Sequence, residues 1–121
     1  MITEPEVIPL LVRACPSFEA VWADNISSPG YEVGLLFVDM GTFACHLVDR
    51  VRSGDLTELP AVFAVVESLL VEGDSYVHEA AVTGLLEGLQ NVASNSDLDP
   101  EVFRPYLGRE ARKSWEALTS V

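Results

Sequence analysis

The two histidines, His46 and His78, are the first candidates for chemistry in this chain, because imidazole transfers protons near neutral pH and binds metal ions. His46 and Asp49 are three residues apart, so on a helix they could form a histidine–carboxylate dyad or part of a metal site. A metal-dependent enzyme would also need His78, and nothing in the sequence brings it into register. The simpler interpretation is that Asp39, Thr42, His46 and Asp49 belong to a solvated polar stripe. We therefore expect no metal and no cofactor.

A second polar group is formed by Glu87 and Gln90, which share a helical face with Asn91. Paired carboxylates for general acid–base catalysis would need a second acid one turn before Glu87, where Thr83 and Gly84 stand instead. Glu87 and Gln90 therefore suit a polar recognition edge better than catalysis. The alternative is that they only face water or form local hydrogen bonds.

Catalytic and nucleotide-binding motifs of the common kinds are absent, among them GxGxxG, the Walker loop, GxSxG and HExxH. Cys45 and His46 are adjacent, so on a helix their side chains point about 100° apart and do not form a dyad. The protein is therefore predicted not to be an enzyme.

The elements that must position these residues are helices, because apolar residues recur at spacings of three and four residues. Almost no stretch alternates apolar and polar residues as a strand does. Thr3, Thr57 and Asp99 stand where helices begin, and Gly54 and Gly73 stand where helices end. Helical segments are expected over residues 3–15, 17–22, 31–52, 57–72, 74–93, 100–107 and 109–118. We predict a single all-α domain over residues 1–121, a bundle of five or six helices with a faint similarity to HEAT-like paired helices.

Gly84 and Gly88 are four residues apart on one face of the segment 74–93. Glycine inside a helix costs roughly 1 kcal/mol relative to alanine, so a pair at this spacing suggests a close approach by another backbone. That backbone belongs either to another helix of this chain or to a partner.

The composition excludes several classes of protein. Hydrophobic residues make up 49% of the chain, with a mean hydropathy of +0.26, which excludes intrinsic disorder. The longest apolar runs, at 33–38 and 61–66, are far shorter than the ~20 residues of a membrane span. The acidic start does not resemble a signal peptide. Cys15 and Cys45 are 30 residues apart without CxxC spacing, so two free thiols and a cytoplasmic location are expected.

Charge is distributed very unevenly along the chain. The formal net charge is −12, and residues 53–103, the acidic block, contain ten acidic residues and no lysine or arginine. Such a field disfavours nucleic acid and favours a protein partner with a basic surface. Asp74, Asp99 and Glu101 are expected at helix starts, where acids stabilise the fold, and Glu58 is grouped with them. The predicted partner-binding residues lie around the turn at Gly73 and on the following helix: Glu67, Glu72, Asp74, Glu79, Glu87 and Gln90.

Four stretches of the chain carry a family resemblance: MGTFACHLVDRVRSG at 40–54, LPAVFAVVESLLVEGD at 59–74, GLLEGLQNVA at 84–93 and LDPEVFRPYLG at 98–108. With them the chain resembles a family of small, acidic, helical bacterial proteins labelled as a domain of unknown function. The resemblance implies an all-helical domain with no established enzymatic role. Similar small acidic proteins often serve as immunity proteins, which bind and silence a toxin of the same bacterium.

Two functions remain as predictions. The first is a protein-binding module, most concretely an immunity protein that neutralises a toxin by occluding a basic surface. The second is a helical scaffold or regulatory protein that forms a homodimer through the face of Gly84 and Gly88.

Overall fold

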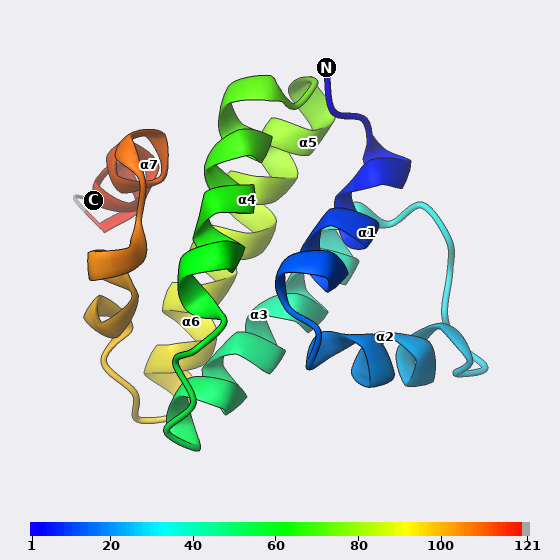
Figure 1. Cartoon of the computed structure of the whole chain (residues 1–121), viewed down its shortest axis with the longest axis horizontal. Helices are drawn as coiled ribbons and strands as arrows, with labels where there is room; N and C mark the ends of the chain where they lie inside the picture. The colour runs from blue at the N-terminus through cyan, green and yellow to red at the C-terminus, as the bar shows by residue number, and fades with distance from the viewer. Residues whose placement is uncertain (120–121) are drawn as a thin grey trace.

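Helices account for nearly all of the regular structure in residues 1–119, which the computed structural model describes (Figure 1). The α-helices are α1 (Glu4–Ala14), α2 (Phe18–Ile26), α3 (Leu36–Arg52), α4 (Leu59–Glu72), α5 (Ser75–Glu79), α6 (Glu87–Asn95) and α7 (Arg109–Thr119). A π-helix, η1 (Ala80–Leu86), and a 3₁₀-helix, η2 (Pro100–Tyr106), complete the order. The all-α prediction is confirmed, and the number of five or six helices is too low. The last two residues of the predicted domain lie outside the described part.

One predicted helix begins later than expected. The segment predicted to be helical from residue 31 enters α3 only at Leu36. Gly34 has φ +90°, a left-handed conformation that glycine adopts without strain and that a helix cannot contain. Residues 31–35 therefore form an irregular strand-free segment that leads into α3 beside α1 (Figure 1).

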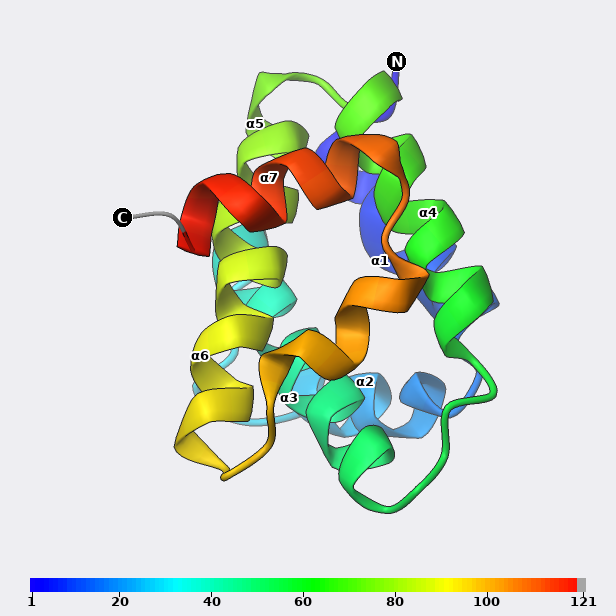
Figure 2. The ribbon, with the colours of Figure 1, turned by 90° about the vertical axis from the view of Figure 1, so that its left-hand side faces the viewer.

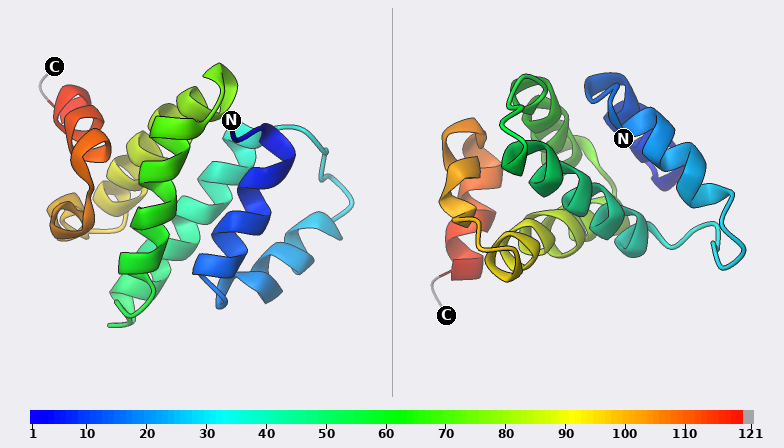
Figure 3. Two further views of the ribbon diagram at one scale, coloured as in Figure 1. Left: turned by 45° about the horizontal axis from the view of Figure 1, so that its top comes forward. Right: turned by 90° about the horizontal axis from the view of Figure 1, so that it is seen from below.

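The core lies between α3, α4 and the continuous helical run of α5, η1 and α6. In α3, the apolar positions Met40, Phe43 and Leu47 are fully buried, as their helical spacing predicts. α4 has α1 on one side and α7 on the other (Figure 3), and η2 and α7 cover the side formed by α4 and α6 (Figure 2). A HEAT-like repeat stays a prediction.

The glycine face of η1 and α6 is occupied by α3. A Cβ placed on Gly84 would lie 2.9 Å from the Cβ of Met40, and one on Gly88 would lie 3.5 Å from the Cβ of Ala44. The expected close approach is therefore confirmed, with α3 as the approaching helix. In the folded protein, α3 therefore takes the place at this face that the prediction gave to a second copy.

The start of the chain is anchored on the turn between α4 and α5. Ile2 forms a β-bridge with Gly73: its N–H donates to the carbonyl of Glu72 at 2.7 Å, and its carbonyl accepts from the N–H of Asp74 at 2.9 Å. Within residues 1–119, no helix has the length and apolar character to cross a membrane.

Candidate functional site

Three of the six predicted partner-binding residues are engaged inside the fold. The Glu67 carboxylate accepts from the N–H groups of Glu110 and Ala111 at 2.7 and 3.0 Å, so it caps the start of α7. Asp74 caps α5 by accepting from the N–H of Val77 at 2.9 Å. The Gln90 amide donates to the Trp115 carbonyl at 3.3 Å, which joins α6 to α7. These side chains have a structural reason for their positions.

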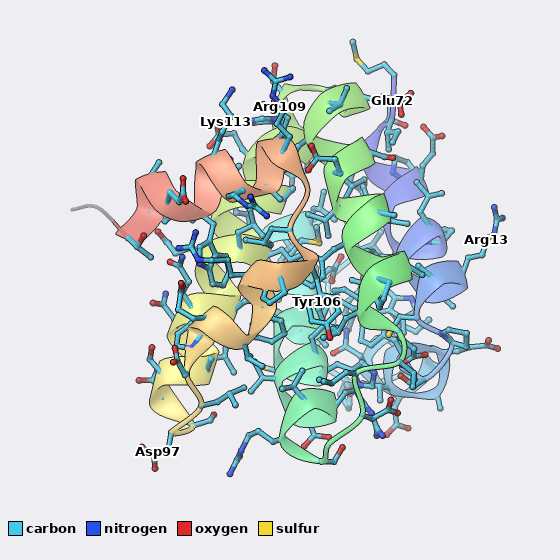
Figure 4. The ribbon with its side chains drawn as sticks, turned by 60° about the vertical axis from the view of Figure 1, so that its left-hand side comes forward. Arg13, Glu72, Asp97, Tyr106, Arg109 and Lys113 are labelled. Atoms are coloured by element: carbon cyan, nitrogen blue, oxygen red, sulfur yellow. The ribbon has the colours of Figure 1, made fainter. Side chains whose placement is uncertain are left out.

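The other three predicted residues differ in exposure. Glu72 and Glu79 are exposed, whereas Glu87 is half-buried. Arg109 and Lys113 of α7 lie at the same end of the molecule as Glu72 (Figure 4). The acidic block has no basic residue in its sequence, but folding brings basic side chains of α7 near the turn at Gly73. The predicted acidic face is therefore smaller and less purely negative than the sequence indicates.

A groove of about 820 Å³ lies between α1, α2 and residues 31–34. We call it the Asp39 groove. Its walls include Ile8, Pro9 and Val12 from α1 and two aromatic residues, Trp22 and Tyr31. The two rings meet edge to face with centroids 5.7 Å apart. A largely apolar groove of this size suits a side chain or short segment of a ligand.

The groove contains one buried carboxylate without a hydrogen-bond partner on one of its oxygens. Asp39 is 3% exposed, and its Oδ1 has no partner. Burial raises the pKa of Asp39 above its ordinary value, the Tyr31 hydroxyl lowers it in part, and the Glu4 carboxylate raises it further. Burial also raises the pKa of Tyr31, with Asp39 adding to the effect. An unpaired buried carboxylate costs stability and is unusual in a folded protein.

The charged residues that line the groove are mostly acidic. Glu4, Glu19 and Asp39 stand against a single base, Arg13. An apolar groove with a carboxylate on its wall and acids at its rim is complementary to a cation carried on an apolar or extended body.

A second polar group, the Ser17 cluster, joins the α1–α2 turn to α3 and to the start of α4. It consists of Cys15, Ser17, His46 and Glu58. The Ser17 hydroxyl donates to Glu58 Oε1 at 2.5 Å and lies 2.8 Å from His46 Nε2, while the Ser17 N–H donates to Glu58 Oε2 at 2.9 Å. The Cys15 thiol donates to Glu58 Oε1 at 3.5 Å. Cys15 is fully buried and His46 is 8% exposed.

Protonation in the cluster follows from burial and hydrogen bonding. Burial lowers the pKa of His46, and the nearby Arg50 lowers it further. Burial raises the pKa of the Cys15 thiol to about 11. Burial alone would raise the pKa of Glu58, but the hydrogen bonds from Ser17 and Cys15 bring it below its ordinary value.

The polar stripe predicted on α3 is wrong for two of its members. Asp39 and His46 are buried, and only Asp49 is exposed as expected. His46 is also not grouped with Asp49 and His78, because His46 faces Ser17 whereas His78 Nδ1 lies 3.1 Å from the Leu70 carbonyl. Polar residues spaced three and four apart on a helix give the same sequence pattern whether the face that they share is exposed to solvent or covered by α1 and α2.

Comparison with known proteins identifies the family. A family model described as "Domain of unknown function (DUF7674)" matches residues 8–120. The chain belongs to the DUF7674 family. No curated protein and no solved structure matches it. The predicted resemblance to a family of unknown function is thereby confirmed, and the family match supplies no functional residues.

The chemistry available to this DUF7674 domain follows from where its protons are held. In the Ser17 cluster the hydroxyl proton is directed at Glu58, so His46 Nε2 is the donor to Ser17 and not a base acting on it. This arrangement does not activate Ser17 as a nucleophile. The Asp39 groove offers charge and shape recognition, and it is the better candidate for a functional site.

Proposed function

We propose that this protein is a protein-binding module whose partner presents a basic surface, most concretely an immunity protein that neutralises a bacterial toxin. The protein acts in the cytoplasm without catalysing a reaction. It places an acidic, groove-bearing face over a basic active-site cleft of the toxin, so that substrate is excluded. A nuclease is the toxin class whose charge fits best, because nuclease clefts are basic.

The observation that carries the proposal is the buried Asp39 carboxylate in the groove, whose Oδ1 has no hydrogen-bond partner. An arginine side chain of the partner would supply the missing hydrogen-bond donors to Oδ1. Its methylene groups and its planar guanidinium would pack on Ile8 and Trp22, which line the same groove. A buried charge pair of this kind, surrounded by apolar walls, has the features of a binding hot spot.

The proposed contact lies in the Asp39 groove, whereas the sequence predicts a contact around the turn at Gly73. The turn at Gly73 keeps Glu72 and Glu79 as exposed acids, and these are expected to act through the long-range field. The Asp39 groove is expected to hold the partner, because Asp39 Oδ1 is the only buried carboxylate oxygen within residues 1–119 that lacks a hydrogen-bond partner.

The test first looks for a toxin-like gene beside the gene of this protein and then measures binding of its product by titration calorimetry. Asp39→Asn is expected to weaken binding at least about 30-fold, because removing one member of a buried charge pair costs roughly 2–5 kcal/mol. Glu79→Gln is the matched control, since it removes one exposed acid outside the groove, and it is expected to change affinity less than about 3-fold. The proposal is wrong if Asp39→Asn binds as tightly as the wild type or if Glu79→Gln is the more harmful change.

A homodimeric scaffold is the second candidate function, and a different surface now favours it. Val33, Leu35 and Val38 are exposed around the start of α3, with Val33 exposed by 88%. Such a patch can be covered by a second copy. Sedimentation separates the two functions, because a scaffold of this kind is expected to be a dimer at micromolar concentration. A protein that sediments as a monomer of 13.2 kDa at that concentration would exclude the scaffold.

A further inference from the structure

We propose that Cys15, His46 and Glu58 form a zinc-binding site that is independent of the Asp39 groove. One ligand atom from each of these residues lies within 4.8 Å of the others. Thiolate, imidazole and carboxylate are the side-chain groups that bind Zn²⁺ in proteins. The three residues come from three separate parts of the fold, the end of α1, the middle of α3 and the residue before α4. Only folding brings them together.

The Ser17 hydroxyl lies among the three ligand atoms in the absence of an ion. Its oxygen lies 2.5 Å from Glu58 Oε1, 2.8 Å from His46 Nε2 and 3.6 Å from Cys15 Sγ. Zinc needs ligand distances of about 2.0–2.3 Å, so the three ligand atoms, which lie within 4.8 Å of one another, have to close in around an ion placed between them. Ser17 is exposed, so its hydroxyl can turn to solvent and leave the position free. Water takes the fourth coordination position.

Binding involves proton transfer and no redox change. The Cys15 thiol loses its proton to solvent as the sulfur–zinc bond forms. The imidazole of His46 stays neutral, but its proton moves from Nε2, which donates to Ser17 without the metal, to Nδ1, so that the Nε2 lone pair binds the metal. Glu58 exchanges its hydrogen bonds from Ser17 and Cys15 for one bond to zinc.

The expected consequence is stabilisation of the fold, because zinc binds these residues together only in the folded state. The Ser17 cluster joins the α1–α2 turn to α3 and to the start of α4, and the metal would replace hydrogen bonds there with three coordinate bonds. At free zinc roughly 100 times the dissociation constant, the midpoint of thermal unfolding is expected to rise by about 10 °C.

The test is titration of the metal-free protein with ZnCl₂ and with CoCl₂. One equivalent of zinc is expected to bind, and cobalt is expected to give a thiolate charge-transfer band in the near ultraviolet. The chain offers matched controls, since it has two cysteines and two histidines. Cys15→Ala and His46→Gln should abolish binding, whereas Cys45→Ala and His78→Gln should retain it.

Two further results distinguish coordination from a purely hydrogen-bonded cluster. Ser17→Ala removes the central hydroxyl and keeps every ligand, so it should bind zinc at least as tightly as the wild type. If Cys15→Ala fails to fold, the cobalt charge-transfer band of the wild type still reports whether sulfur is a ligand. The proposal is overturned if zinc at micromolar concentration neither binds nor stabilises the wild type, if cobalt gives no such band, or if the Cys45 and His78 variants lose binding equally.

Discussion

At the scale of single residues, two buried polar side chains of α3 determine what the two candidate sites of this protein can do. Asp39 and His46 are 3% and 8% exposed, yet they differ in how well they are satisfied. His46 meets the Ser17 hydroxyl, whereas one oxygen of Asp39 meets no donor. A cost of this kind is understandable if a ligand supplies the missing donor when it binds.

The first prediction concerns the pH dependence of stability. The pKa of Asp39 is raised in the folded protein, so its folded state binds the proton more tightly than the unfolded state does. The contribution of Asp39 to stability is therefore complete below the unfolded-state pKa of about 3.9 and is lost as the pH rises through the folded-state pKa. Urea unfolding of the wild type and Asp39→Asn at several pH values measures it.

The free energy of unfolding of the wild type relative to Asp39→Asn should decrease as the pH rises from 4 toward neutrality. A difference that stays constant, or one that grows with pH, would mean that the Asp39 carboxylate is satisfied in the folded protein.

At the scale of elements, acids of the acidic block hold helices in place from outside those helices. Glu67 of α4 caps α7, and Glu58 binds the N–H at the start of α2. The first N–H groups of a helix lack partners within it and attract negative charge, so each carboxylate joins two elements. Part of the negative charge of the block is therefore used inside the fold.

The second prediction tests this capping. Glu67→Ala is expected to lower the free energy of unfolding by about 2 kcal/mol, because two N–H groups at the start of α7 lose a charged acceptor. Denaturant unfolding measures the change. Glu79→Gln, at an exposed position, is the control and should stay within about 0.5 kcal/mol of the wild type. Equal stability of both variants would remove the capping role.

The third prediction contrasts the two glycines that face α3. Gly84→Ala places a Cβ 2.9 Å from the Met40 Cβ, so α3 has to move, and a loss of about 1–2 kcal/mol is expected. Gly88→Ala makes an ordinary contact of 3.5 Å and gains helix propensity, so it should stabilise by up to about 1 kcal/mol. Thermal unfolding of the two variants measures both changes. A Gly84→Ala variant that is more stable than the wild type would contradict the tight contact between Gly84 and Met40.

Sequence patterns predicted the helices well and the candidate site poorly, for physical reasons. The apolar stripe of α4 and the close approach at Gly84 are local properties of a helix, and they are readable from spacing. The groove depends on α1 and α2 covering one face of α3, which no local pattern encodes. Glu67 looks like surface charge in sequence because its N–H partners lie in α7, whereas the position of Asp74 at the start of α5 is readable from the sequence.

At the scale of the whole molecule, the net charge of −12 acts on encounter with a partner more than on the final contact. The basic residues of α7 moderate the field near Glu72 (Figure 4), while the groove side keeps three acids against one base. A basic partner should therefore be drawn to the groove side of the protein.

The fourth prediction follows from this field. The association rate with a basic partner should fall at least about 10-fold when NaCl is raised from ~0.05 to ~0.5 M, because long-range attraction is screened. Glu4→Gln combined with Glu19→Gln, at the groove rim, should reduce both the rate and its salt dependence. Stopped-flow kinetics measures both, and a rate indifferent to salt would contradict steering.

The central claim is that the Asp39 groove receives a cationic side chain, and NMR titration of the labelled protein with N-acetyl-arginine amide tests it most directly. The account predicts shifts of the Trp22 indole and of the Gly34 and Asp39 amides, together with a lower pKa of Asp39 in the bound state. Asp39→Asn should abolish these shifts. Shifts confined to the turn at Gly73, or an equal response in Asp39→Asn, would contradict the account.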